Sequence, residues 1–209
     1  MKENIINSAK NEHIKYLSKL KMKKYRDEYG LYLIEGDKII QEARHAGAEF
    51  VYIIYDDRYS SNTIEAKHRL YVSNSILKSV SSLDSPQGII AAVRIKENDY
   101  NITDGRWLLL DEIRDPQNAA AIVRSADCAG FEGVVFANNS VDIYNEKFLR
   151  AAMGSNYHIK LINSKNIDTT LSYFKDKNYH ILGADLQGNE SCEIKGDKIL
   201  LVIGNESNG

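Results

Sequence analysis

Short apolar runs alternate with amphipathic stretches along the first half of the chain. The apolar runs predict strands, and apolar positions recurring every three or four residues predict helices. The expected strands are 31–36, 50–56, 69–73 and 88–95, and the expected helices are 11–26, 37–47 and 74–80. This alternation over about 95 residues predicts a small α/β domain.

The second half repeats the alternation with longer apolar runs. The expected strands are 107–112, 133–137, 158–162, 179–184 and 198–203, and the expected helices are 116–129, 145–153 and 166–176. Nearly continuous apolar strands separated by helices indicate a parallel sheet that is covered on both faces. The polar segment 96–105 reads as a linker, so we expect domains at 1–96 and 105–209.

Composition narrows the class of protein without naming a function. The chain has 209 residues, a net charge of −2 and 43% hydrophobic residues, which is typical of a globular protein. The two cysteines have no metal-ligand spacing, so we expect no metal site, and the cytoplasm is the default location. No apolar run approaches the roughly 20 residues that span a bilayer, so we expect no membrane partner.

Local charge differs from the overall charge in the first predicted helix. Cations crowd this helix, and tyrosines lie between them. Such a mixture suits RNA contact through phosphate pairing and base stacking, although an ordinary solvated helix face has the same pattern. The candidate RNA-binding residues are Lys15, Lys19, Lys21, Lys23, Lys24 and Arg26.

The segment 108–136 carries the clearest chemistry-bearing pattern. Asp115 and Pro116 form a strong helix start, with aspartate as N-cap and proline in the first turn. Asn118 and Arg124 are then the conspicuous polar groups of an alanine-rich helix. Arginine is rarely buried without a partner. Arg124 is therefore a candidate ligand-binding residue or, alternatively, a structural ion-pair partner of Glu112 or Asp127.

The segment 200–209 also runs from a buried strand into a polar loop. Gly204 and Gly209 bracket this loop, whose single acid is Glu206. A glycine directly after a strand allows a ligand to approach the backbone, although an ordinary loop has the same appearance. No Gly-x-Gly-x-x-Gly, phosphate-binding loop or Gly-x-Ser-x-Gly pattern is present, so dinucleotide binding of the Rossmann type is not supported.

These segments together resemble the SpoU (TrmH-like) family of RNA ribose 2′-O-methyltransferases, which belongs to the SPOUT superfamily. Residues 7–43 and 85–93 look like the start and end of its N-terminal RNA-binding domain. LLLDEIRDPQNAAAIVRSADCAGFEGVVF looks like the family's first motif, with Asn118 and Arg124 as its N-x5-R core. LLVIGNESNG looks like the start of the second motif, with Glu206 as its acid.

The resemblance implies a fold, a cofactor and a set of site residues. It implies a small N-terminal α/β RNA-binding domain and a parallel-sheet methyltransferase domain with a C-terminal knot. It also implies a homodimer that binds S-adenosylmethionine and methylates RNA, with ribosomal RNA as the expected substrate. The catalytic residues would be Asn118, Arg124 and Glu206, and the cofactor-binding residues Ala184, Ile203, Gly204 and Asn205.

The sequence departs from the family pattern after Gly209, before the third motif. That motif supplies cofactor contacts and the segment threaded through the knot, so we expect both to be missing from these 209 residues, which would then be inactive alone. Three other functions stay open. They are a non-catalytic RNA-binding protein that has lost its cofactor pocket, a transfer-RNA 2′-O-methyltransferase, and a small-molecule methyltransferase.

Overall fold

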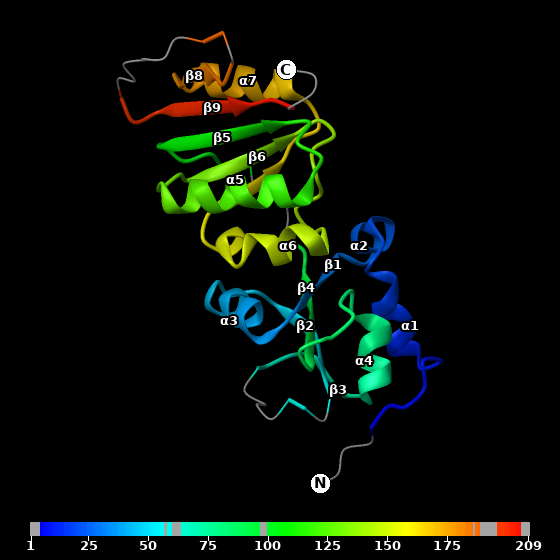
Figure 1. Cartoon of the computed structure of the whole chain (residues 1–209). Coiled ribbons are helices and arrows are strands. Elements are labelled where there is room, and N and C mark those ends of the chain that lie inside the picture. Colours follow the sequence, from blue (N-terminus) through cyan, green and yellow to red (C-terminus); the bar gives the residue numbers. More distant parts are fainter. Residues whose placement is uncertain are drawn as a thin grey trace. The chain divides into compact units, whose positions relative to one another are not determined.

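The computed structural model describes residues 5–56, 58–59, 64–96, 100–185, 187–188 and 196–205. The chain divides into two compact units, Met1–Lys96 and Glu97–Gly209 (Figure 1). Each unit has its own sheet and its own hydrophobic core. No helix within the described ranges is both long and apolar enough to cross a membrane.

Unit 1 is built on a mixed four-stranded sheet of order β1-β4-β2-β3. Strands β1 and β2 both pair antiparallel to β4, and β3 pairs parallel to β2. Helices α1 and α4 lie on one side of this sheet and α3 on the other (Figure 1). The strands are β1 (Leu31–Glu35), β2 (Phe50–Tyr55), β3 (His68–Tyr71) and β4 (Ile89–Arg94), and the helices are α1 (Glu12–Lys19), α2 (Lys23–Tyr29), α3 (Asp37–His45) and α4 (Asn74–Val80).

The single helix predicted over 11–26 is wrong, because two helices occupy this stretch. Helix α1 ends at Lys19, and α2 begins at Lys23 after the extended residue Met22. The Arg26 guanidinium, on a residue only 5% exposed, donates hydrogen bonds to the carbonyls of Leu20 and Lys21 at 3.0 and 2.9 Å. These bonds satisfy carbonyls that the broken helix leaves without helical partners.

Unit 2 confirms the predicted parallel sheet. Its five strands have the order β7-β6-β5-β9-β8, and every neighbouring pair is parallel. Because all strands run the same way, their carboxyl ends share one edge of the sheet. The strands are β5 (Arg106–Asp111), β6 (Gly133–Ala137), β7 (Lys160–Asn163), β8 (His180–Gly183) and β9 (Ile199–Ile203).

Helices cover both faces of this sheet (Figure 1). On one face, Phe174 of α7 packs with Trp107 and other alternate strand residues, and its ring makes an edge contact with Trp107 at 6.2 Å. On the other face, Phe148 of α6 packs edge-on against Phe136 at 5.6 Å. The helices are α5 (Pro116–Cys128), α6 (Glu146–Ala152) and α7 (Ile167–Asp176), with a short 3₁₀ turn at Ser155–Tyr157.

Candidate active site at the carboxyl edge of the parallel sheet

The strand order of unit 2 creates a switch point between β5 and β9. The chain runs outward from β5 through β6 to β7, then returns by α7 to the opposite side for β8 and β9. In open α/β sheets, ligands bind outside the carboxyl ends of the strands at such a point. The register pairs Leu110 with Ile203, so the loops that follow β5 and β9 begin side by side there.

The loop after β5 is held in a defined shape. Glu112 has a φ of 54°, in the left-handed region that a non-glycine residue rarely adopts. Its carboxylate forms an exposed ion pair with Arg114 at 2.9 Å. The Asp115 carboxylate then accepts hydrogen bonds from the backbone nitrogens of Gln117 and Asn118, both at 2.8 Å. The predicted N-cap and first turn are therefore present, and they place Asn118 at the edge of the sheet.

The loop after β6 supports the loop after β5. Ser140 donates a hydrogen bond to the Leu110 carbonyl at 3.1 Å and accepts one from the backbone nitrogen of Ile113 at 3.2 Å. Asn138, with a φ of 49°, donates from its side-chain amide to Asp111. Two residues strained into the left-handed region of backbone conformation, Glu112 and Asn138, thus directly follow adjacent strands. Such strain tends to concentrate at functional sites.

The second motif contacts the first through Asn205. The Asn205 side-chain amide donates a hydrogen bond to the Glu112 carbonyl at 2.9 Å, across 93 residues of sequence. Ile203, Gly204 and Asn205 are half-buried. Ala184 is exposed after β8, and its backbone nitrogen donates to the Val202 carbonyl at 3.0 Å. All four candidate cofactor residues therefore lie at the same edge, whereas Glu206 falls outside the described residues.

Arg124 is not brought to this edge within one chain. It follows Asn118 by six residues, which corresponds to about 9 Å along the helix axis. The structural ion pairs considered for it are absent, since Glu112 pairs with Arg114 and Asp127 pairs with His158 at 2.8 Å. Among the described residues Arg124 has no hydrogen-bond or ion-pair partner, and its side chain is exposed.

The six cations proposed for RNA contact in unit 1 do not behave alike. Arg26 is buried against backbone carbonyls and is unavailable to a phosphate, so its predicted role is corrected. The Lys21 amine donates to the carbonyls of Ser79 and Ser81 at 3.1 and 2.7 Å, which caps the end of α4. Lys23 forms an exposed i, i+4 pair with Asp27.

Two lysines instead converge on one aromatic ring. The amines of Lys19 and Lys24 lie 5.2 and 5.7 Å from the ring centroid of Tyr25. Tyr25 in turn contacts Tyr29, which stacks on Tyr16 at 4.3 Å. Lys15 is also exposed on α1. Among the described residues, Lys15, Lys19 and Lys24 are thus the exposed candidates that donate to no carbonyl or carboxylate, and two of them flank Tyr25.

Comparison with known proteins decides the family. Residues 105–209 match the family model described as the SpoU rRNA Methylase family. The chain belongs to the SpoU rRNA methylase family. Residues 11–91 of this SpoU chain match a second model, described as the MRM3-like substrate binding domain.

Curated relatives resemble the SpoU chain to different extents. It is 31% identical over 208 residues to the 23S rRNA (guanosine(2553)-2′-O)-methyltransferase RlmP of Bacillus subtilis, covering 98% of this chain and 83% of that protein. It is 30% identical to the mitochondrial rRNA methyltransferase 3 of Xenopus laevis, covering 73% of this chain and 40% of that protein. The SpoU chain thus spans less than half the length of the mitochondrial relative.

Solved structures share the SpoU fold over nearly the whole chain. A putative RNA methyltransferase of the TrmH family from Porphyromonas gingivalis has a TM-score of 0.85 at 27% identity, covering 94% of this chain and 80% of that one. The methyltransferase AviRb from Streptomyces viridochromogenes, solved in complex with AdoMet, has a TM-score of 0.85 at 20% identity, covering 96% of this chain and 83% of that one. At 20% identity, the second likeness concerns the fold alone.

Proposed function

We propose that this protein is an S-adenosylmethionine-dependent methyltransferase that methylates a ribose 2′-hydroxyl of ribosomal RNA. The observation that carries the proposal is the hydrogen bond from Asn205 to the Glu112 carbonyl. It joins the two motifs at the switch point of the parallel sheet, in a chain that belongs to a family of rRNA methylases. The kind of RNA follows from the relatives, which are named as rRNA methyltransferases.

The residues at the carboxyl edge fit the proposed cofactor. Ile203 and Ala184 offer apolar surface, and the backbone of Gly204 and Asn205 offers polar groups to an adenine or a carboxylate. The cofactor, when bound, supplies a methyl carbon made electrophilic by its sulfonium. The protein's task is to hold the ribose oxygen in line with that carbon. Such positioning lowers the activation barrier of methyl transfer.

We assign to Arg124 the role of contacting the reacting nucleotide during methyl transfer. Arg124 acts by charge and hydrogen bonding, because a guanidinium carries a positive charge and five N–H donors and has no acceptor. It can hold the adjacent phosphate through two parallel hydrogen bonds and stabilise negative charge that develops on the 2′-oxygen. Asn118, at the edge itself, is assigned to orient the ribose. We also assign Glu206 to this site as an acid that fixes the loop.

The position of Arg124 favours a homodimer. It lies about 9 Å along α5 from Asn118 and is exposed beside Ala121, Ser125 and Cys128, three small exposed side chains. Small side chains allow a second helix to approach closely, so a twin subunit can bring its carboxyl edge to Arg124. We propose that the active protein is such a homodimer, which binds no metal and works in the cytoplasm.

The function is tested with the full-length protein and S-adenosylmethionine labelled in the methyl group. We expect label to enter ribosomal RNA, and mass spectrometry of nuclease digests should place it on the ribose. Label in transfer RNA but not in ribosomal RNA would show that the substrate is transfer RNA. If calorimetry detects RNA binding but no cofactor binding, the protein is a non-catalytic RNA-binding protein and not an enzyme.

Asn205→Ala is expected to weaken cofactor binding without unfolding the protein. The change removes one hydrogen bond, worth about 0.5–1.5 kcal/mol, and frees the loop after β9 from the loop after β5. The dissociation constant for S-adenosylmethionine should therefore rise roughly 2- to 12-fold in calorimetry. Asn7→Ala is the matched control, because among the described residues that exposed amide donates only to the nearby Ile5 carbonyl of unit 1. An unchanged affinity in Asn205→Ala would remove this residue from the site.

Lys19→Ala combined with Lys24→Ala is expected to weaken RNA binding and flatten its salt dependence. Each lost phosphate contact reduces the magnitude of the slope of log K against log salt concentration by about 0.7–0.9. The slope of the double variant should therefore be smaller in magnitude by about 1.4–1.8. Fluorescence anisotropy with a ribosomal RNA fragment measures this slope.

The control for this experiment is Lys38→Ala with Lys78→Ala, which removes two exposed lysines elsewhere on unit 1. Lys21→Ala should lower the thermal stability of unit 1 instead, because its amine caps α4. If the control flattens the slope as much as Lys19 and Lys24 do, these two lysines make no specific contact.

A further inference from the structure

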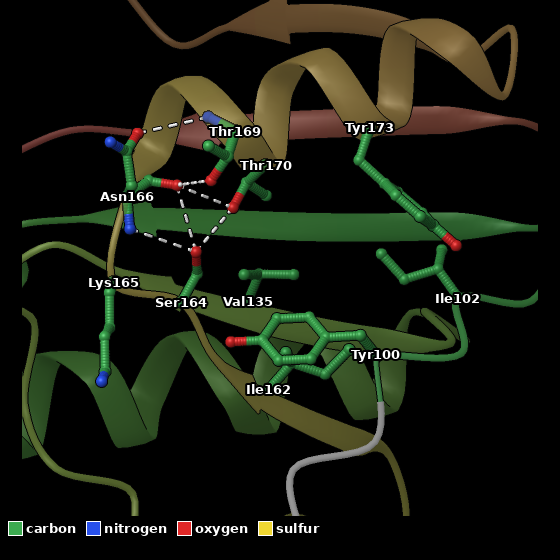
Figure 2. Close-up of a pocket in the computed structure, with 10 residues that line it drawn as sticks. All are labelled: Tyr100, Ile102, Val135, Ile162, Ser164, Lys165, Asn166, Thr169, Thr170 and Tyr173. Carbon is green, nitrogen blue, oxygen red and sulfur yellow. Dashed lines mark hydrogen bonds between the residues drawn. The ribbon is translucent and has the colours of Figure 1, made fainter.

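A cavity of about 320 Å³ lies in unit 2 between α7, β7 and the segment before β5 (Figure 2). Its size falls in the lower part of the range for small-ligand pockets. It is distinct from the β5–β9 switch point, because its residues come from the segment before β5, from β6, from β7 and the loop that follows it, and from α7. The lining residues are Tyr100, Ile102, Val135, Ile162, Ser164, Lys165, Asn166, Thr169, Thr170 and Tyr173.

The cavity has an apolar floor and two aromatic walls. Val135 and Ile162 form the floor from the strands, and Tyr100 and Tyr173 stand on separate sides with Ile102 near Tyr173 (Figure 2). Tyr100 is 50% exposed and Tyr173 is 37% exposed, which is unusual for rings of this size. Exposed rings above an aliphatic floor suit a flat aromatic group, which gains by stacking.

The polar end of the cavity is rigid because its hydroxyls bond to each other. Ser164 and Thr170 are both 8% exposed, and their hydroxyl oxygens lie 2.7 Å apart. The Asn166 carbonyl oxygen lies 3.1 Å from each hydroxyl oxygen, so one hydroxyl donates to this carbonyl while the other donates to its neighbouring hydroxyl (Figure 2). The Asn166 side chain caps α7 by accepting from Asp168 and Thr169. These groups shape the end of the pocket and leave little hydrogen-bonding capacity for a ligand.

The groups left for a ligand are a cation and a phenol. Within the described parts of the chain, neither the Lys165 amine nor the Tyr173 hydroxyl has a hydrogen-bond or ion-pair partner. The Tyr100 hydroxyl, in contrast, already donates to the Asn163 carbonyl. A second cation, Lys177, lies 5.8 Å from the Tyr173 ring centroid. The pocket thus combines stacking surface with positive charge at its rim.

We propose that this cavity binds a nucleotide, with its base between Tyr100 and Tyr173 and its phosphate at Lys165. The proposal rests on the proposed function in one respect, since it takes an unpaired nucleotide of the RNA substrate as the occupant. Lys165 follows β7 at the same edge as the switch point, and β7 lies two strand spacings from β5, about 10 Å. A nucleotide flanking the methylated one can span that distance.

The experiment titrates the full-length protein with 5′-AMP, adenosine and a single-stranded RNA pentanucleotide by calorimetry. Saturable binding of 5′-AMP is expected, and Tyr173→Ala should weaken it at least about fivefold through loss of stacking. Tyr173→Phe keeps the ring and should retain binding. Lys165→Ala should weaken 5′-AMP binding about 3- to 10-fold and leave adenosine binding unchanged, whereas replacement of Lys175, an exposed lysine on α7, by alanine should alter neither.

The two possible sources of the nucleotide give different results. A similar loss of pentanucleotide affinity in Tyr173→Ala identifies RNA as the occupant, whereas a loss confined to 5′-AMP identifies a free nucleotide. Absence of saturable 5′-AMP binding, or binding unchanged in Tyr173→Ala, overturns the proposal. Methyl transfer measured in parallel separates this failure from a failure of the proposed function, because nucleotide binding here needs no turnover.

Discussion

Replacing Arg124 by alanine is expected to abolish methyl transfer while the protein stays folded. The side chain is exposed and has no partner among the described residues, so its removal should change the free energy of unfolding by no more than about 0.5 kcal/mol. Loss of a group that stabilises charge in the transition state should reduce the rate roughly 10²- to 10³-fold. The initial rate of methyl transfer to ribosomal RNA measures this effect.

Two further variants test whether the guanidinium geometry of Arg124, and not merely a positive charge, is required for methyl transfer. Arg124→Lys keeps the charge but loses the planar fork, so it should not restore the rate. Arg44→Ala removes an exposed arginine from α3 in unit 1 and should be fully active. RNA binding should weaken only modestly in Arg124→Ala. Near-full activity in this variant would remove Arg124 from the active site and with it the argument for a twin subunit.

Gly133→Ala is expected to cause a large loss of stability in unit 2. A β-carbon at this position of β6 would lie within 3.0 Å of both the Trp107 ring and the Lys160 carbonyl. Neither neighbour can move easily, because Trp107 is fully buried and Lys160 belongs to the adjacent strand. Overpacking of this kind costs about 3 kcal/mol, which corresponds to a fall in the melting temperature of roughly 10 °C.

The chain offers a matched control and a selective probe for this prediction. Gly183, also in a strand of the same sheet, has no atom within 4 Å of an added β-carbon, so Gly183→Ala should be neutral or slightly stabilising. Trp107 is the only tryptophan of the chain, and its fluorescence therefore follows the unfolding of unit 2 alone. Equal melting temperatures for the two variants would contradict the steric argument.

Sequence reasoning succeeded where a signal is local. The apolar runs of the second half predict β5, β6 and β9 to within about a residue, because a buried parallel strand needs a continuous apolar stretch. The start of α5 also followed from Asp115 and Pro116, whose chemistry acts on the adjacent backbone. The predicted helix 11–26 was wrong because the chain breaks at residues 20–22, where the Arg26 guanidinium caps the carbonyls of Leu20 and Lys21, a contact that helical periodicity does not mark.

The candidate site needed information that sequence patterns do not carry. The contact between Asn205 and Glu112 joins residues 93 positions apart, and only the strand order brings them together. Spacing could not show that Lys21 caps α4 while Lys19 and Lys24 flank Tyr25. The cavity beside Tyr173 was missed because its residues come from four separate segments, and no local pattern marks them.

The position of β9 in the sheet also determines when unit 2 can complete its folding during translation. This strand, among the last residues synthesised of those described, inserts between β5 and β8. Until it emerges from the ribosome, β5 has one open edge with unpaired backbone groups, which invites aggregation. Pairings this distant in sequence also form slowly. Unit 2 should therefore depend on chaperones during translation far more than unit 1, whose sheet is complete by Arg94.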